Sequence, residues 1–295
     1  MLFVLAFDHR NSFRTGFFGI HGDPTPEQQS QCREAKLVIL DGLMHAVNLG
    51  LPDGKAGVLV DDEYGAEAVI RARQAGMTVA TPVERSGRRE LEFEHDPFFE
   101  SIERLRPDYV KVLVRYNPEA DATMNLRQRM KLSEVQEWAA QHGMGLMLEL
   151  LVPAEAGQTR RVGGEDSRYD LELRPRLTLA AVKELIAAGL SPNLWKLEGM
   201  SSRAQYVAIA AEVRSTRPDA GCLVLGRGAD EAAVERWLTL AAPVSGFSGF
   251  AVGRTIWWEP LRAYYDGRVS RTEAIETISG NYRRLVRVYL QAATS

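Results

Sequence analysis

The chain has 295 residues, of which 45% are hydrophobic and 25% charged, and its 36 Lys and Arg against 39 Asp and Glu give a formal net charge of −3. These proportions are typical of a folded globular protein and exclude an intrinsically disordered chain. The slightly acidic balance also gives no basic surface for nucleic acid. The length suits two ordinary domains or one α/β barrel, which typically occupies about 250 residues.

The cysteine content and the first residues indicate a cytoplasmic protein. Cys32 and Cys222 are too few and too isolated for a disulfide framework or a zinc site, so both are expected to be reduced and buried. The apolar run at 2–7 has no basic segment before it and is followed at once by Asp8, which argues against a signal peptide. No apolar stretch reaches the roughly 18 residues of a membrane span, so no membrane partner is expected.

Eight short runs of apolar, β-forming residues predict strands along the whole chain. They lie at 2–7, 56–60, 77–83, 109–116, 145–152, 194–198, 222–226 and 249–253. Most are continuously apolar rather than alternating, which is typical of parallel strands that are covered on both faces.

Helical segments separate these strands. They are expected at 30–50, 66–76, 132–143, 179–189, 203–215 and 230–241, and several end at glycine, the common residue just past a helix. Eight alternations of strand and helix without a linker predict a TIM (β/α)8 barrel, an α/β fold, as a single domain over 1–295.

A doubly wound open sheet would show the same alternation of elements. The sequence after its first strand, DHRNSFRTGFFG, lacks the G-x-G-x-x-G phosphate fingerprint of the usual version of that fold. Two longer irregular segments, 8–29 and 153–177, follow the first and fifth strands. Loops of this length in a compact domain usually cover or complete a binding site.

Active sites of such barrels form at the carboxyl ends of the strands, where this sequence is rich in ionisable residues. The residues at these ends are Asp8, His9, Arg10, Asp61, Asp62, Glu63, Glu84, Arg85, Lys111, Arg115, Glu149, Lys196, Glu198, Arg227 and Arg254. Lys111 and Lys196 are unusual because each interrupts an apolar strand. A desolvated lysine beside another cation loses its proton more readily, and the neutral amine can form a Schiff base with a carbonyl.

The alternative for either lysine is an ion pair with an interior carboxylate. That alternative stays open for Lys111, whereas Schiff-base chemistry is favoured for Lys196. Glu149, between apolar neighbours, should have its pKa raised by burial unless a lysine stabilises the charge, and it suits proton transfer. Asp8 at the end of the first strand is a second candidate for catalysis, with ion pairing again as the alternative.

The last two strands both end in Gly-Arg, at Gly226-Arg227 and Gly253-Arg254. Phosphate sites of such barrels are often built from the loops after strands seven and eight, where backbone N–H groups meet the ligand. Glycine permits close approach of the backbone, and arginine can bind an anion with two hydrogen bonds. The pair predicts a site for a phosphate or another anionic group.

Other conspicuous residues are expected to have structural roles. Trp257 and Trp258 should cover the barrel, and Arg160 and Arg161 of the fifth loop should be solvated. The acidic run Asp61–Glu63 resembles half of a metal site, but the histidines show no ligand spacing to complete it. No metal and no cofactor are expected.

The segments LAFDHR, VLVDDEYG, YVKVLVRYNPE, LMLELLVP, LWKLEG and AVGRTIW resemble class I aldolases of the tagatose-1,6-bisphosphate aldolase type. The chain resembles more closely the 2-deoxy-5-keto-gluconate 6-phosphate aldolase (DUF2090) domain that is fused to sugar kinases in bacterial inositol catabolism. The resemblance runs from the first strand to the last helix. His9 within the D-x-R motif differs from the tagatose enzymes, and the sequence has no kinase domain.

The resemblance implies a cytoplasmic aldehyde-lyase that acts on a small phosphorylated sugar and needs no metal. It places the Schiff base at Lys196, proton transfer at Glu149 and Asp8, and at Lys111 a cation that keeps Lys196 neutral and orients a substrate hydroxyl. The phosphate-binding ends would include Gly226, Arg227, Gly253 and Arg254. Arg10, Arg115 or the fifth-loop arginines would suit an acidic group at the aldehyde end.

The implied reaction is reversible cleavage of a phosphorylated keto sugar or sugar acid, such as 2-deoxy-5-keto-gluconate 6-phosphate. The products would be dihydroxyacetone phosphate and an aldehyde such as malonate semialdehyde. Tagatose bisphosphate and sulfofructose phosphate are alternative substrates. A non-catalytic sugar-phosphate sensor or scaffold and a metal-dependent lyase using Asp61, Asp62 or Glu63 are alternative functions, and the oligomeric state, including a homo-oligomer, stays open.

Overall fold

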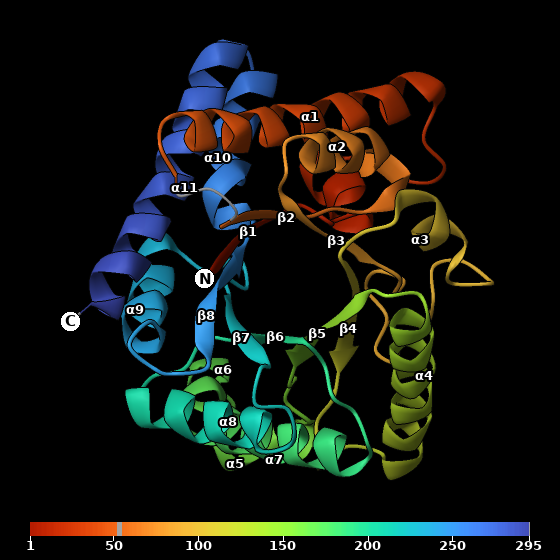
Figure 1. The fold of residues 1–295 in the computed structure, drawn as a ribbon, viewed down its shortest axis with the longest axis vertical. Coiled ribbons are helices and arrows are strands. Elements are labelled where there is room, and N and C mark those ends of the chain that lie inside the picture. Colours follow the sequence, from red (N-terminus) through yellow and green to blue (C-terminus); the bar gives the residue numbers. More distant parts are fainter. Residues whose placement is uncertain (52–54, 295) are drawn as a thin grey trace.

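The computed structural model describes residues 1–51 and 55–294. Eight parallel strands close into one barrel in the order β1 to β8, with β8 paired to β1 (Figure 1). The strands are β1 (Leu2–Ala6), β2 (Ala56–Leu59), β3 (Thr78–Pro82), β4 (Tyr109–Arg115), β5 (Gly145–Leu151), β6 (Leu194–Glu198), β7 (Gly221–Leu225) and β8 (Phe247–Val252). All eight predicted strands and the predicted single (β/α)8 barrel are confirmed.

Helices surround the barrel (Figure 1). They are α1 (Pro26–Asn48), α2 (Asp62–Gln74), α3 (Glu100–Leu105), α4 (Ala122–Gln141), α5 (Ala156–Arg161), α6 (Asp166–Arg168), α7 (Arg174–Ala187), α8 (Arg203–Thr216), α9 (Glu231–Ala241), α10 (Arg254–Tyr265) and α11 (Arg271–Ala293), with π-helical turns η1 (Ser12–Phe17) and η2 (Tyr169–Leu173). Within the described ranges, no helix is long and apolar enough to cross a membrane.

Several helices begin before the residues expected from the apolar pattern. α1 starts at Pro26 because the Thr25 hydroxyl accepts from the backbone N–H of Gln28 and the Gln28 side chain accepts from that of Thr25. α4 starts at Ala122, where Asp121 caps the helix. The first turn of α1 is polar and mostly exposed, and the buried positions early in α4 include the polar Asn125 and Gln128, so the apolar periodicity locates only the later turns.

The segments 8–29 and 153–177, predicted to be irregular, are irregular only in part. The first contains η1 and the start of α1, and the second contains α5, α6, η2 and the start of α7. Phe13 and Phe17 of η1 are buried and stack 5.4 Å apart against Trp257. Tyr169 of η2 donates a hydrogen bond to the carbonyl of Val152. Both segments are therefore folded onto the barrel by apolar and polar contacts from distant residues.

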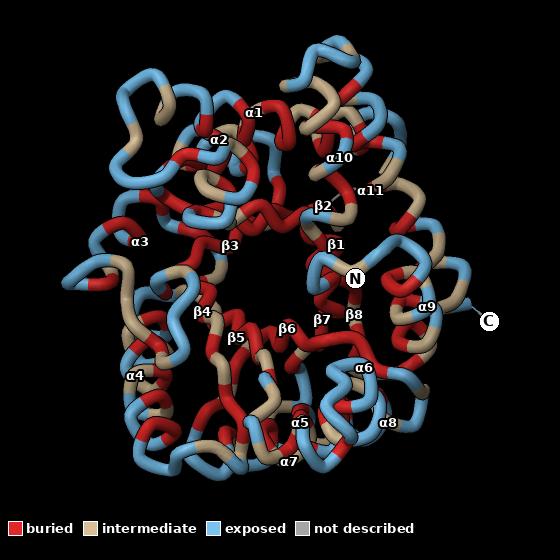
Figure 2. The backbone as a smooth tube through the Cα atoms, turned by 180° about the vertical axis from the view of Figure 1, so that it is seen from behind, coloured by how far each residue is buried: buried red, intermediate tan, exposed pale blue. Residues whose placement is uncertain are grey.

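The strands are buried along almost their whole length (Figure 2), which explains their continuously apolar sequences. The barrel interior holds a small apolar cluster that includes Val4, Ala6, Leu59, Met147 and Ala251. Ala6 and Ala251, the small members near the carboxyl ends, also line the cavity above the cluster. Cys32 and Cys222 are both free and buried, as the sequence predicts.

Barrel closure between β1 and β8 requires a glycine at 249. Gly249 pairs with Leu2 and has φ +147°, and a Cβ there would lie 1.9 Å from the Leu2 carbonyl oxygen. We expect Gly249→Ala to lower the free energy of unfolding by about 3 kcal/mol, because the backbone of β1 cannot yield cheaply. Urea denaturation followed by circular dichroism measures this.

The matched control is Gly280→Ala, on the exposed face of α11, where a Cβ meets nothing within 4 Å. It should keep or raise stability, by up to about 1 kcal/mol, because alanine is the better helix former. Equal stabilities of the two variants would contradict the steric requirement at 249.

Candidate active site

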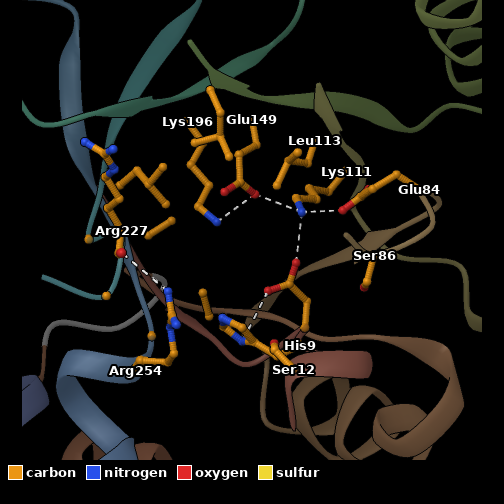
Figure 3. Close-up of a pocket in the computed structure, with 18 of the residues that line it drawn as sticks. His9, Ser12, Glu84, Ser86, Lys111, Leu113, Glu149, Lys196, Arg227 and Arg254 are labelled. Carbon is orange, nitrogen blue, oxygen red and sulfur yellow. Dashed lines mark hydrogen bonds and ion pairs between the residues drawn. The ribbon is translucent and has the colours of Figure 1, made fainter. Parts of the chain in front are cut away.

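A cavity of about 350 Å³ opens at the carboxyl ends of the strands (Figure 3). Its floor carries ionisable side chains that come from different strand ends and converge on one another. They are Asp8 after β1, Glu84 after β3, Lys111 on β4, Glu149 on β5 and Lys196 on β6. The sequence prediction that these ends meet is therefore reflected in the geometry.

Lys111 lies at the centre of this group. Its Nζ is 2.9 Å from Asp8 Oδ2, 2.6 Å from Glu84 Oε1 and 2.8 Å from Glu149 Oε2. Lys111 is only 1% exposed. One buried ammonium thus binds three carboxylates from three other strand ends.

Lys196 lies on the other side of Glu149. The two residues are register partners on β6 and β5, and Lys196 Nζ is 2.9 Å from Glu149 Oε2. A single carboxylate oxygen therefore bridges both lysines. This arrangement gives Glu149 direct access to the proton of Lys196.

The charges shift the ionisation of the carboxylates in different directions. Burial alone would raise the pKa of both Asp8 and Glu149, but Lys111 and Lys196 outweigh it and lower the pKa of each, that of Asp8 well below its usual range. The pKa of Glu84 is raised, because burial outweighs the attraction of Lys111. Against burial, the carboxylates raise the pKa of Lys111 well above its usual value.

These shifts refine two expectations. Glu149 follows the predicted case in which a lysine stabilises the carboxylate against burial. Lys111 was expected to keep Lys196 neutral by like-charge repulsion, but its charge is surrounded by three carboxylates, so in this arrangement that repulsion is offset. Lys111 instead holds the carboxylates together.

His9, the residue that departs from the tagatose-type motif, also lines the cavity. Its Nδ1 is 4.0 Å from Asp8 Oδ1, and its ring packs edge-on against Trp257. Burial lowers the pKa of His9 to about 4 despite Asp8, so the imidazole is neutral near pH 7. Trp257 also donates from Nε1 to the carbonyl of Ala6, a covering role in line with the expectation for that residue.

Gly226, Arg227, Gly253 and Arg254 all line the cavity, on the ends of β7 and β8. A Cβ at Gly226 would lie 2.9 Å from Val252 Cγ1, and one at Gly253 would lie 2.1 Å from the Ala6 carbonyl oxygen, so close packing requires both glycines. α10 begins directly after Gly253 without a side-chain cap. The N–H groups of its first turn are therefore suited to an anion.

The two arginines of this end differ. The Arg227 guanidinium is engaged by Asp170 at 2.7 Å and Glu198 at 3.2 Å, so its side chain is not the anion clamp expected from the sequence. Arg227 contributes its backbone, which has φ +53° and forms a turn with Gly228. Arg254 donates to the carbonyl of Arg227 at 3.3 Å and presents the cationic side chain of this end (Figure 3).

Arg10 does not line the cavity, contrary to the expectation of a substrate contact. It is 3% exposed, with Nη1 3.3 Å from Asp62 Oδ1 and Nη2 donating to the carbonyl of Glu84. Its guanidinium therefore joins the end of β1 to the ends of β2 and β3. The sequence could not separate this role from anion binding, because the partners of Arg10 are distant in the chain.

The acidic run Asp61–Glu63 is also used structurally. Asp61 pairs with the buried Lys36 and accepts from the backbone N–H of Tyr64, while Asp62 lies 2.7 Å from His95 Nε2. Across residues 1–51 and 55–294, no group of three or more His, Cys, Asp or Glu side chains could hold a metal ion.

The fold and this constellation define a (β/α)8 barrel with a paired-lysine site at its carboxyl face. The family described as "Uncharacterized protein conserved in bacteria (DUF2090)" matches residues 1–293, and the chain belongs to this family. The predicted membership in that family is therefore confirmed. No curated protein sequence matches the chain.

Solved structures similar to this chain include several aldolases. Fructose-bisphosphate aldolase from Plasmodium falciparum is 12% identical with a TM-score of 0.67, and the match covers 97% of this chain and 90% of that one. An archaeal fructose-1,6-bisphosphate aldolase, whose catalytic Lys is covalently bound to a carbinolamine intermediate, is 11% identical with a TM-score of 0.60, covering 98% and 93%. Cgl0159 from Corynebacterium glutamicum is 19% identical with a TM-score of 0.56, covering 96% and 85%. These likenesses establish a shared fold.

The Lys111 cluster predicts an unusual pH dependence of stability. In the native protein the lowered pKa values of Asp8 and Glu149 stabilise the fold at neutral pH, and this contribution is lost as the pH falls through the lowered values. In Lys111→Met the three buried carboxylates lose the cation that they share, so their pKa values should rise. We expect a loss of about 3–5 kcal/mol in unfolding free energy at neutral pH, with partial recovery near pH 5.

Urea titrations at several pH values measure this. The control is Lys183→Met on α7, whose side chain is 56% exposed and 3.9 Å from Glu212, and which should follow the native profile. A Lys111→Met protein that loses stability on acidification as the native protein does would contradict the electrostatic account.

Proposed function

We propose that the protein is a class I aldolase that reversibly cleaves a phosphorylated keto sugar or sugar acid through a Schiff base on Lys196. The observation that carries this proposal is the 2.9 Å contact of Lys196 with Glu149 on the floor of the cavity. It joins a buried amine to a proton acceptor within reach of an anion-binding end. The likeness to the tagatose-type aldolases and the shared fold with Schiff-base aldolases support the same reaction.

The first steps follow from this contact. Lys196 passes a proton to Glu149 and adds its amine to the ketone carbon, giving a carbinolamine. Glu149, with Asp8 nearby in the cluster, returns a proton to the carbinolamine oxygen, which leaves as water. The iminium then accepts the electron pair of the adjacent C–C bond, and the enamine is protonated and hydrolysed to dihydroxyacetone phosphate. The imine supplies the electron sink, so the proposed chemistry requires no cofactor.

One end of the cavity suits the phosphate of such a substrate, and the opposite end suits the part that leaves as the aldehyde. Arg254, the first turn of α10 and the loop after β7 would hold the phosphate. Ser86 lies across the cavity from Arg254 (Figure 3), and Arg85 and Arg115 belong to the same lining. Arginines in this lining would suit an acidic aldehyde, so we propose 2-deoxy-5-keto-gluconate 6-phosphate as substrate and malonate semialdehyde as second product.

Borohydride trapping tests the Schiff base. Reduction in the presence of dihydroxyacetone phosphate should add one ligand-derived mass to the native protein, located at Lys196 by peptide mass spectrometry. Lys196→Met should lose the adduct and reduce cleavage by more than about 1,000-fold, because covalent catalysis is removed. Lys183→Met, a surface lysine change, should behave as the native protein.

A panel of ketose phosphates separates the substrate alternatives. Cleavage of 2-deoxy-5-keto-gluconate 6-phosphate, tagatose bisphosphate and sulfofructose phosphate is followed by a coupled assay for dihydroxyacetone phosphate. Binding of these compounds without cleavage or adduct would indicate a sensor and refute the proposed reaction. Preference for one of the other two compounds would refute only the proposed substrate.

Arg254 tests the phosphate end. Arg254→Ala should raise KM for the phosphorylated substrate by about 10- to 100-fold, since a charge-assisted contact is lost, with a smaller change in kcat. Steady-state kinetics measures both constants, and Arg236→Ala, an exposed change on α9, is the control. Equal KM values for the two variants would place the phosphate elsewhere.

A further inference from the structure

Glu84 is the member of the cavity floor to which neither the sequence nor the mechanism above gives a role. It follows β3 and is held by its neighbours: it forms an antiparallel bridge with Phe93, and the N–H of Arg85 donates to the carbonyl of Glu92 at 2.7 Å. Arg10 donates to the carbonyl of Glu84 itself. The backbone that carries this carboxylate is therefore fixed on both sides.

One oxygen of Glu84 is paired and the other is not. Oε1 accepts from Lys111 Nζ at 2.6 Å, whereas Oε2 is buried and has no hydrogen-bond partner. The side chain is 10% exposed and lines the cavity. A buried acceptor without a partner costs about 1–3 kcal/mol. Because Glu84 belongs to the cavity lining, a ligand bound there can bring the donor that Oε2 lacks.

The position of Glu84 in the cavity indicates which part of the substrate would lie next to it. Lys111 stands between Glu84 and Glu149, and Lys196 lies beyond Glu149. Arg254 is on the far side of the cavity from Glu84 (Figure 3). With the phosphate at Arg254 and the ketone carbon at Lys196, the part of the substrate nearest Glu84 is the carbon beyond the bond that breaks.

We propose that Glu84 is a further catalytic residue, whose Oε2 binds the hydroxyl on that carbon and accepts its proton during cleavage. This inference rests on the proposed aldolase function. As the C–C bond breaks, its electron pair moves to the iminium and forms the enamine. The O–H electron pair becomes the second bond of the aldehyde C=O, and the proton passes to Oε2. Condensation returns the same proton to the new hydroxyl.

The pKa values of the three carboxylates around Lys111 are shifted in different directions, which agrees with separate roles for Glu84 and Glu149. The pKa values of Asp8 and Glu149 are lowered by the lysines, whereas burial raises the pKa of Glu84. Glu84 is therefore the strongest base of the three, and its Oε2 is the one buried oxygen among them that lacks a hydrogen-bond partner. Glu149 remains the proton acceptor for Lys196.

Glu84→Gln separates the cleavage step from Schiff-base formation. It should keep the borohydride adduct of dihydroxyacetone phosphate on Lys196 and the solvent exchange of the hydroxymethyl hydrogen, both within several-fold of native. Cleavage of the ketose phosphate should fall by about 100- to 1,000-fold, because only the hydroxyl proton has lost its acceptor. The control is Glu92→Gln on the same loop, which is 44% exposed and should cleave at the native rate.

A second variant covers the case in which glutamine disturbs the cluster. Glu84→Ala leaves space for a small acid, and added formate should restore cleavage in a concentration-dependent way. Native-like cleavage by Glu84→Gln, an equal loss of adduct, exchange and cleavage, or no rescue of Glu84→Ala by formate would each overturn the role of Glu84. Absence of an adduct in the native protein would instead overturn the proposed function.

Discussion

The site depends on one interaction, the sharing of the Lys111 ammonium by Asp8, Glu84 and Glu149. Two unit charges 4 Å apart interact by about 4 kcal/mol at an effective dielectric constant of 20, so three carboxylates gathered around one ammonium repel one another strongly. Lys111 makes their proximity tolerable. Because the carboxylates come from the ends of β1, β3 and β5, the cluster also requires the closed barrel.

The carboxylates that share the Lys111 ammonium differ in their other contacts. Glu149 has a second cation in Lys196, and one of its oxygens bridges the two lysines, which keeps it ionised. Glu84 is attracted by Lys111 and Arg10, but burial outweighs both, and its second oxygen has no hydrogen-bond partner. The same centre thus provides an ionised carboxylate beside the amine and a more basic one farther away. In the proposed mechanism these carboxylates are the separate proton acceptors for two different proton transfers.

A layer of buried cations outside the cavity fixes the strand ends that carry these groups. Lys36 of α1 is fully buried, pairs with Asp61 and donates to the carbonyls of Phe7 and His9, on either side of Asp8. Arg10 joins Asp62 to the carbonyl of Glu84. Both cations use their charge to hold backbone carbonyls in place. The precision of the Lys111 cluster therefore depends on residues that never reach the ligand.

Residues that lie on the strands could be predicted from the sequence more readily than the contacts of the arginines that follow the strands. Lys196 and Glu149 stand out because each interrupts an apolar strand, and strand order alone places them side by side. Arg10, Arg227 and Arg254 look equivalent in the sequence, since each follows a strand end. Their directions are decided by Asp62, by Asp170 with Glu198, and by the carbonyl of Arg227, residues whose proximity exists only in the folded barrel.

The proposed role of Glu84 could not be predicted from the sequence either. Its position after a strand is visible in the sequence, but its proposed role rests on Oε2, which the folded protein leaves without a hydrogen-bond partner. Chain order can place an ionisable group at the carboxyl face. Only the count of donors and acceptors around it distinguishes a group that stabilises the barrel from one that is left to meet a ligand. Arg10 pairs with Asp62 and Glu94 and does not line the cavity, so it belongs to the first kind, whereas Glu84 lines the cavity and is proposed to belong to the second.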